Sequence, residues 1–133
     1  MKILLLGASG QVGWELQRAL APLGQLVICD RHSADLENPQ ALSELVEREQ
    51  PAVIVNAAAY TAVDKAESDV ERARKVNAES VAALAAVARK LGAWLVHYST
   101  DYVFDGSKTT PYHEADTPHP LGVYGASKAA GEQ

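Results

Sequence analysis

An apolar run followed directly by a glycine-rich segment opens the chain, and this pairing constrains the fold more than any other feature. Residues 2–6 (Lys-Ile-Leu-Leu-Leu) form the kind of run that is typical of a strand buried on both faces. Residues 7–13 then carry glycines at every third position, and a helical pattern follows over residues 12–20. A strand, a glycine turn and a helix in this order predict a βα unit whose turn is open to a ligand.

The alternation of apolar runs and helical patterns continues along the chain. Three more strands are expected, at residues 26–30, 52–56 and 94–98. One helix is predicted from the Asn38–Pro39 start signal to about residue 49, and a longer one from about residue 69 to residue 91, with Gly92 as its C-cap. Such alternation implies parallel pairing and right-handed crossovers. The predicted fold class is α/β, a doubly wound Rossmann-type parallel sheet with the strand order 3-2-1-4.

The glycine segment has the properties of a dinucleotide-binding turn. Gly7 permits the tight turn, Gly10 lets a pyrophosphate approach the backbone, and Gly13 lets the helix pack closely on the strand. The spacing has neither the lysine nor the Ser/Thr of a P-loop. Asp30, at the end of the second strand, can accept from an adenosine ribose hydroxyl, which favours NAD. Arg31 can pair with a 2′-phosphate, which favours NADP, so the pair predicts use of either NADPH or NADH.

Composition narrows the choice of partners. The chain has 133 residues, of which 47% are hydrophobic and 22% charged, and its formal net charge is -5. This balance disfavours nucleic acid and anionic membranes as partners, because phosphate binding requires clustered cations. The single cysteine, Cys29, fits a reducing compartment, and the apolar start is too short for a membrane span, so a cytoplasmic location is expected. The four histidines lack zinc-ligand spacing, and no metal site is predicted.

A tyrosine and a lysine lie one turn apart on the helix predicted near the C-terminus. Tyr124 and Lys128 share one face at this spacing, and a nearby cation favours the phenolate form of a tyrosine. Ser99-Thr100-Asp101 follows the strand at 94–98, where open α/β sheets bind ligands, and a hydroxyl there can bond a substrate carbonyl. Either feature alone also fits ordinary turn or helix structure. Together with the glycine turn, they occur in the order that a hydride-transfer site requires.

These motifs resemble those of the extended short-chain dehydrogenase/reductases and, within them, the dTDP-4-dehydrorhamnose reductase family. The similar stretches extend over nearly the whole chain and include residues 10–16, 56–67 and 97–104. The resemblance implies an oxidoreductase of dTDP-rhamnose biosynthesis. Its reaction would reduce the 4-keto group of dTDP-4-dehydro-β-L-rhamnose to give dTDP-β-L-rhamnose, with NADPH or NADH.

The resemblance also implies roles for individual residues. Tyr124 matches the proton donor, Lys128 its partner and a ligand of the nicotinamide ribose, and Thr100 the hydroxyl partner. Asp101 and Tyr102 match positions that contact the deoxysugar. With the glycine turn and Arg31 included, the full set of predicted cofactor-binding residues is Gly7, Gly10, Gln11, Val12, Gly13, Asp30, Arg31, Asp35, Leu36, Ala59, Tyr60, Thr61, Tyr124 and Lys128.

The family has a C-terminal part that closes over the sugar nucleotide, and nothing in residues 1–133 corresponds to it. Residues 123–133 predict a helix without the following strand that a parallel crossover needs. We therefore expect residues 1–133 to form an NAD(P)-binding Rossmann-type domain, truncated before its last strands and the substrate domain, and inactive in isolation. Some members form dimers through Mg²⁺, and Glu15 matches one of the glutamates involved, so a homodimer with Mg²⁺ is an expectation for the longer protein.

The residue after Asp101 separates the predicted reductase from its relatives. Sugar-nucleotide 4,6-dehydratases have Asp-Glu after the threonine, because elimination of water needs an added acid/base pair, whereas this chain has Asp101-Tyr102. A simple reductase needs no such pair. Two alternatives stay open: a non-catalytic NAD(P)-binding regulatory subunit, and a reductase of another nucleotide-linked sugar.

Overall fold

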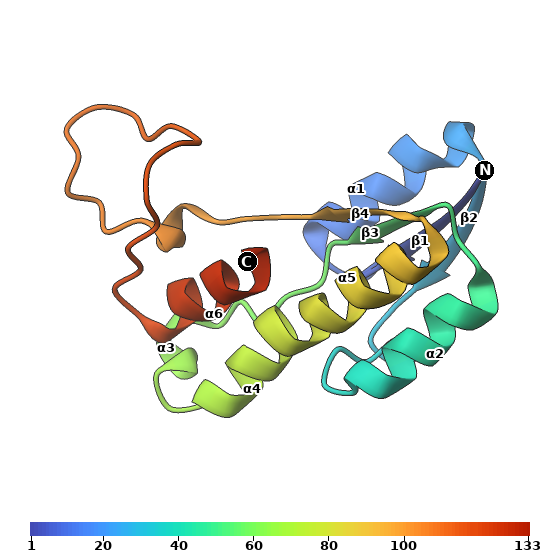
Figure 1. The fold of residues 1–133 in the computed structure, drawn as a ribbon, viewed down its shortest axis with the longest axis horizontal. Helices are drawn as coiled ribbons and strands as arrows, with labels where there is room; N and C mark the ends of the chain where they lie inside the picture. Colours follow the sequence, from blue (N-terminus) through green and yellow to red (C-terminus); the bar gives the residue numbers. More distant parts are fainter.

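Four parallel strands with helices on both faces make up the chain (Figure 1), in a computed structural model that describes residues 1–133. The strands are β1 (Lys2–Leu6), β2 (Gln25–Cys29), β3 (Val53–Asn56) and β4 (Trp94–His97). The helices and helical turns are α1 (Gln11–Leu20), η1 (Ala21–Leu23), α2 (Pro39–Glu49), α3 (Val63–Ala66), α4 (Val70–Arg74), η2 (Lys75–Glu79), α5 (Ser80–Leu91), η3 (Asp101–Val103) and α6 (Val123–Glu132). All four predicted strands and the predicted α/β class are confirmed.

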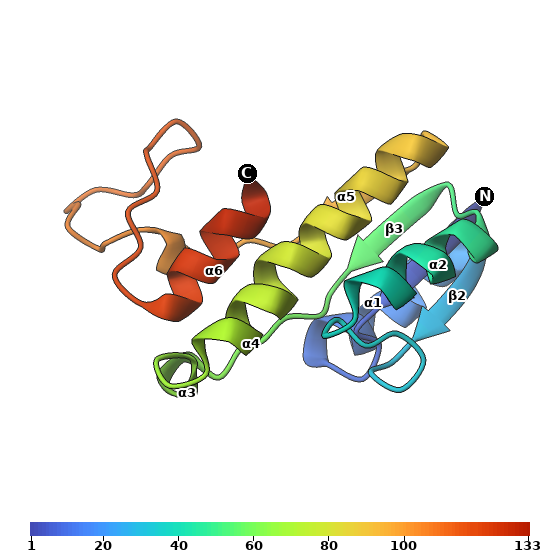
Figure 2. The same cartoon turned by 60° about the horizontal axis from the view of Figure 1, so that its bottom comes forward.

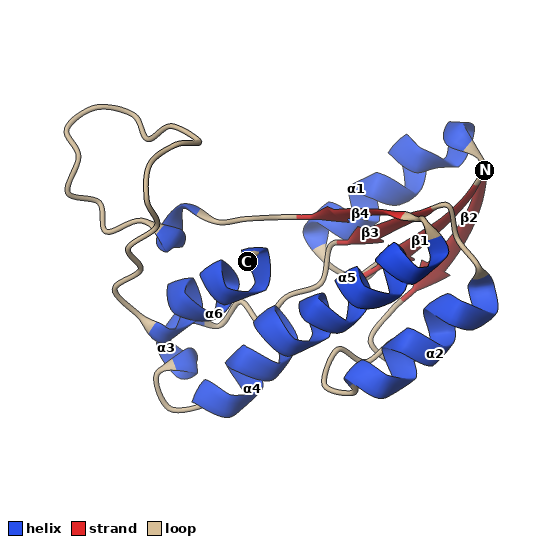
Figure 3. Cartoon of the chain, viewed as in Figure 1, coloured by secondary structure: helices blue, strands red, loops and turns tan.

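Two cores pack against the opposite faces of the sheet. Helix α1 covers one face, and α2 and α5 cover the other (Figure 3). Leu4 and Leu6 of β1 face α2 and α5, while Ile3 and Leu5 face α1, because successive side chains of a strand alternate between its faces. Strand β1 is therefore buried on both faces, and the turn that follows it starts from a rigid position.

The order of the strands differs from the prediction. The sheet has the order β2-β1-β3-β4, so β3 pairs with β1 and β4, and the predicted order 3-2-1-4 is wrong. A right-handed crossover lets β3 join the sheet on either free side of the β1–β2 pair. The residues Ile54 to Asn56 of β3 are buried and suit a central position, whereas Ile28 of β2 is 50% exposed, as an edge strand allows.

The long helix predicted at residues 69–91 forms in three continuous pieces. Helices α4 and α5 are joined by the π-helical turn η2 (Figure 2), and Gly92 ends the helix in the left-handed conformation with φ 67°. A π turn holds one residue more than a regular α-helical turn. Asn77, in this turn, is buried, and its side chain is hydrogen-bonded to the loop after β3.

The stretch between η3 and α6 is a long loop. It extends beside α6 and away from the sheet (Figure 1). Stacked rings of Phe104 and Tyr112, with centroids 4.2 Å apart, and an ion pair from Lys108 to Asp116 give the loop internal contacts. No helix of the chain combines the length and the apolar character needed to cross a membrane.

Candidate functional site

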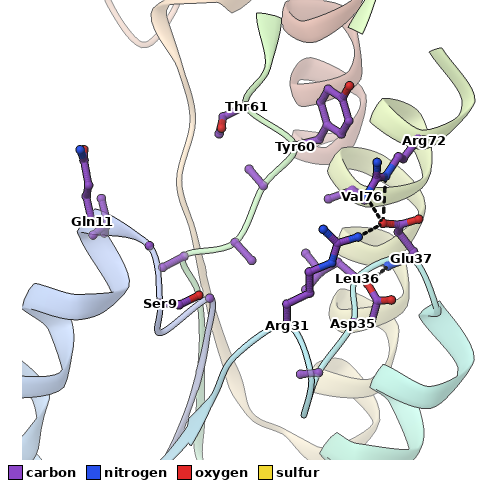
Figure 4. A pocket seen from close by; sticks show the side chains of 17 residues that line it. Ser9, Gln11, Arg31, Asp35, Leu36, Glu37, Tyr60, Thr61, Arg72 and Val76 are labelled. Carbon is purple, nitrogen blue, oxygen red and sulfur yellow. Dashed lines mark hydrogen bonds and ion pairs between the residues drawn. The ribbon is translucent and has the colours of Figure 1, made fainter. Parts of the chain in front are cut away.

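A cleft of about 580 Å³ lies at the carboxyl ends of β1 and β3 (Figure 4). Its walls are the turn after β1, the loops after β2 and β3, and the α4–η2 helix. The lining residues are Gly7, Ser9, Gly10, Gln11, Val12, Arg31, Ala34, Asp35, Leu36, Glu37, Ala57, Ala58, Ala59, Tyr60, Thr61, Arg72 and Val76. The cleft thus brings together all the predicted cofactor residues except Gly13, Asp30, Tyr124 and Lys128.

Close approaches of the backbone build the glycine turn. Gly7 has φ 79°, and a Cβ there would lie 2.6 Å from the backbone nitrogen of Ala58. A Cβ on Gly13 would lie 2.1 Å from the carbonyl oxygen of Gly7, so both positions require glycine for packing. Gly10 differs, because a Cβ there would meet only the Gly7 carbonyl oxygen, at 3.4 Å. Its missing side chain keeps the cleft open in front of α1.

The N-terminus of α1 faces this opening without a capping side chain. Its N-cap residue is Gly10, and the first turn of the ten-residue helix holds no acidic side chain. The first N–H groups of an α-helix have no partner within the helix and carry a partial positive charge. Together with the open position at Gly10, they fit the pyrophosphate of a dinucleotide.

Asp30 follows β2 directly, and its carboxylate folds onto its own turn. Oδ1 accepts from the backbone N–H groups of His32 and Ser33, each at 3.0 Å, and from Ser33 Oγ at 2.9 Å. The hydrogen bonds from Ser33 are the main reason that the pKa of Asp30 is lowered. Asp30 does not line the cleft, so its ribose contact stays a prediction.

Charged side chains gather on the side of the cleft opposite Gln11 (Figure 4). Glu37 Oε1 accepts from Arg31 Nη2 at 2.5 Å and from Arg72 Nε and Nη2 at 2.9 and 2.6 Å. The hydrogen bonds and charge of Glu37 raise the pKa of Arg72. The Arg72 guanidinium also lies 5.8 Å from the centroid of the Tyr60 ring. One carboxylate is therefore shared by two arginines at this end.

Tyr124 and Lys128 lie one turn apart on α6, as predicted, but outside the cleft. Lys128 is only 3% exposed, and its Nζ donates to the Tyr98 carbonyl oxygen at 2.6 Å and lies 3.2 Å from His97 Nε2. Burial lowers the pKa of Lys128. The Tyr124 ring packs edge-on against Tyr102, with centroids 5.5 Å apart. The lysine is thus held by groups at the end of β4.

Thr100 caps the short helix η3. Its Oγ1 accepts from the backbone N–H of Tyr102 and donates to Asp101 Oδ1, both at 3.3 Å. Gly125 lets α6 approach this turn, because a Cβ at that position would lie 2.1 Å from the Tyr102 carbonyl oxygen. The hydroxyl and the tyrosine helix are therefore neighbours, while the contacts of Thr100, Asp101 and Tyr102 with a substrate stay predictions.

A buried asparagine joins the cleft to the tyrosine helix. Asn77 Oδ1 accepts from the backbone N–H of Tyr60 at 2.8 Å, and its Nδ2 donates to the Tyr60 carbonyl oxygen and to Ser127 Oγ, both at 3.0 Å. Tyr60 lines the cleft, and Ser127 lies on α6 between Tyr124 and Lys128. One side chain thus connects the two regions through both N–H groups and the oxygen of its amide.

The family profile described as RmlD substrate binding domain matches residues 1–133. The chain belongs to this family. A dTDP-4-dehydrorhamnose reductase of Burkholderia thailandensis is 58% identical over 132 residues, which are 99% of this chain and 44% of that protein. The chain spans about half the length of the curated relatives it matches. The predicted resemblance is confirmed.

Solved structures of two further proteins share the arrangement of this RmlD-family chain. The dTDP-4-dehydrorhamnose reductase ortholog from Clostridium acetobutylicum gives a TM-score of 0.95 at 41% identity, covering 99% of this chain and 48% of that one. The Bacillus anthracis dTDP-4-dehydrorhamnose reductase, in complex with NADP, gives 0.93 at 38% identity, covering 98% of this chain and 47% of that one.

Some residues of the RmlD-family site were not predicted. Glu37 and Arg72 are 35 residues apart in the sequence, and no local spacing of residues predicts such a pair. His97 is also part of the site; it lies between Asn56 Nδ2 and Lys128 Nζ, at 3.2 Å from each. Burial and the charge of Lys128 lower its pKa to about 4. Its place two residues before Ser99 at a strand end was the one signal for a role near the site.

No three His, Cys, Asp or Glu side chains lie close enough together to hold a metal ion. Glu15, the residue matched to a dimer-linking glutamate, forms an ion pair with Arg18 on the surface of α1.

Proposed function

We propose that this chain is the NAD(P)-binding part of a reductase that converts dTDP-4-dehydro-β-L-rhamnose to dTDP-β-L-rhamnose with NADPH or NADH. The observation that carries the proposal is the Asn77 connection, which couples a cleft suited to a dinucleotide to the helix bearing Tyr124 and Lys128. The identity to the Burkholderia thailandensis protein, 58% over nearly the whole chain, supports the choice of substrate.

The cleft would hold the cofactor between the glycine turn and the loop after β3. The α1 N-terminus and Gly10 would receive the pyrophosphate, and Leu36 would offer an apolar surface on the adenine side. Ala59, Tyr60 and Thr61 would line the path toward the reaction centre. When bound, the reduced nicotinamide supplies a hydride to the 4-keto carbon of the sugar.

Tyr124 would complete the reduction by donating its phenolic proton to the carbonyl oxygen as negative charge develops there. Donors aimed at that oxygen lower the barrier, because they interact more strongly with the developing alkoxide than with the ketone. Lys128, held from behind by the Tyr98 carbonyl oxygen and His97, would support the phenolate that remains. Thr100 would orient the carbonyl, and Asp101 and Tyr102 would contact the deoxysugar.

The reaction of the full-length protein tests this proposal. With dTDP-4-dehydrorhamnose and NADPH, we expect loss of the reduced-nicotinamide absorbance and formation of dTDP-rhamnose in equal amounts. The same 4-keto sugar linked to UDP serves as the control for the nucleotide. Tight cofactor binding without turnover of either sugar would favour a regulatory subunit, and faster turnover of the UDP sugar would favour another nucleotide-linked substrate.

A further inference from the structure

Glu37 lies beside Arg31 and Arg72, the two cationic side chains that line the cleft. Its Oε1 is the shared acceptor of Arg31 and Arg72, and all three side chains line the cleft (Figure 4). Arg31 follows Asp30 at the end of β2, the position from which a Rossmann-type domain reaches the adenosine ribose. A carboxylate at this point therefore occupies the cation that a 2′-phosphate would need.

The two arginines are not held equally. Arg72 has partners besides Glu37, since its Nη1 lies 3.9 Å from Asp69 Oδ2 and its guanidinium lies over the Tyr60 ring. Arg31 makes its single side-chain hydrogen bond to Glu37, and its side chain is 65% exposed. Release of Glu37 would therefore free Arg31 and leave Arg72 in place.

The balance of charge acts against a phosphate while Glu37 holds Arg31. Asp35 and Glu37 line this end of the cleft together with the two arginines, so the lining charges cancel. A phosphate monoester brings a charge of about -1.5 to -2 at neutral pH. It would meet no free cation unless the Arg31–Glu37 pair opened.

We propose that Glu37 is a specificity-determining residue that disfavours NADP(H) by occupying Arg31. NAD(H), which has a ribose hydroxyl in place of the 2′-phosphate, needs no cation there and binds with the pair closed. NADP(H) binds only after its phosphate displaces the Glu37 carboxylate from Arg31. This inference rests on the dinucleotide-binding function proposed above.

Binding of adenosine nucleotides that differ only in the 2′-phosphate tests the inference. The purified protein and its Glu37→Gln variant are titrated with adenosine 2′,5′-bisphosphate and with 5′-AMP, and then with NADP⁺ and NAD⁺. We expect Glu37→Gln to bind the bisphosphate and NADP⁺ about five- to tenfold more tightly, as one charge–charge contact in a partly exposed site permits. Affinity for 5′-AMP and NAD⁺ should stay within about twofold.

Two further variants isolate the mechanism. Glu47→Gln makes the same change of net charge on α2, where Glu47 pairs with Lys90 outside the cleft, and should leave both affinities unchanged. Arg31→Gln, added to Glu37→Gln, should abolish the gain. If Glu37→Gln does not fold, Glu37→Asp, with a shorter reach, should give a smaller gain in the same direction.

Several results would overturn the inference. Unchanged or weaker binding of the bisphosphate by the Glu37 variants would show that Glu37 is neutral or helps Arg31 reach the phosphate. An equal gain in Glu47→Gln would reduce the effect to net charge. If the unaltered protein bound none of the four nucleotides, the proposed function would fail as well, whereas binding that is independent of Glu37 would overturn this inference alone.

Discussion

The cleft and the tyrosine helix are held in place by different kinds of contact. In the glycine turn of the cleft, backbone atoms occupy the space that a Cβ would need, as the Gly7 carbonyl oxygen does beside Gly13. The tyrosine helix depends on side-chain hydrogen bonds from other elements, through Lys128, Ser127 and the backbone N–H of Val123, which donates to Glu67 at 2.8 Å.

The two regions therefore tolerate different kinds of substitution. A turn packed through its backbone is damaged by added atoms, since neighbouring main chain cannot move aside cheaply. A helix held by buried polar groups is damaged by removed atoms, because the partner left behind loses its hydrogen bond in a place that water does not reach. Substitutions that add or remove single groups therefore separate the two regions.

The largest effect is expected at Tyr124. Tyr124→Phe removes the phenolic proton and keeps the ring that packs on Tyr102, so kcat of the full-length protein should fall by about 10²–10⁴-fold with little change in cofactor affinity. Steady-state kinetics and a NADPH titration measure both. Tyr98→Phe, which leaves the carbonyl that binds Lys128 intact, is the control. A near-normal kcat in Tyr124→Phe would eliminate the proposed proton transfer.

Added methyl groups probe the cleft. Gly13→Ala places a Cβ on the Gly7 carbonyl, and we expect it to lower the free energy of unfolding by about 3 kcal/mol. Gly10→Ala has room within the fold and should change that free energy by less than about 0.5 kcal/mol. Its methyl group should nevertheless weaken NAD⁺ binding at least about tenfold, because it stands in front of the α1 N-terminus.

Urea unfolding and calorimetric titration of the two glycine variants make this test. Equal stability of Gly13→Ala and the unaltered protein would mean that the turn can relax. Normal NAD⁺ binding by Gly10→Ala would mean that the pyrophosphate does not approach this glycine.

Removal of Asn77 probes the connection between the regions. Asn77→Ala leaves the backbone N–H and carbonyl of Tyr60 without their partner, and we expect the free energy of unfolding to fall by about 2–4 kcal/mol. Ser127→Ala removes only the α6 partner and should cost less. Denaturant unfolding compares the two variants, and similar losses in both would place the important bond on α6 and not on the cleft loop.

A pH dependence is expected from His97, and it is the smallest of these effects. The pKa of His97 is lowered from 6.5 to about 4 by burial and by Lys128, so the unfolded chain takes up a proton between these values and the folded chain does not. The free energy of unfolding should therefore fall by about 1–3 kcal/mol as the pH drops from 6.5 to 4.

His97→Gln keeps a polar group and cannot titrate, so its unfolding free energy should depend less on pH over this range. Unfolding in urea at a series of pH values measures the difference. Parallel curves for the two proteins would show that His97 keeps an ordinary pKa.

The elements could be predicted from the sequence because their signals are local. Apolar runs that end in small or polar residues marked the strands, Asn38 and Gly92 marked helix ends, and Tyr124 and Lys128 fell one turn apart on α6. Strand order could not be predicted, since periodicity records which residues are buried but not which neighbour a strand pairs with. The pair of Glu37 with Arg72 likewise depends on where the loop before α2 meets α4 in space.

The π turn at Lys75–Glu79 changes the direction in which the side chains of α5 point relative to those of α4. Each residue turns an α-helix by about 100°, so the extra residue in η2 rotates everything after it relative to everything before. Arg72 can thus face the cleft while Leu84 and Val87, further along the same continuous helix, face the sheet. Deletion of one residue here would convert the π turn to a regular α-helical turn. The two halves of the helix could then no longer both keep their orientation, and either Leu84 and Val87 would rotate away from the core or Arg72 would rotate away from the cleft.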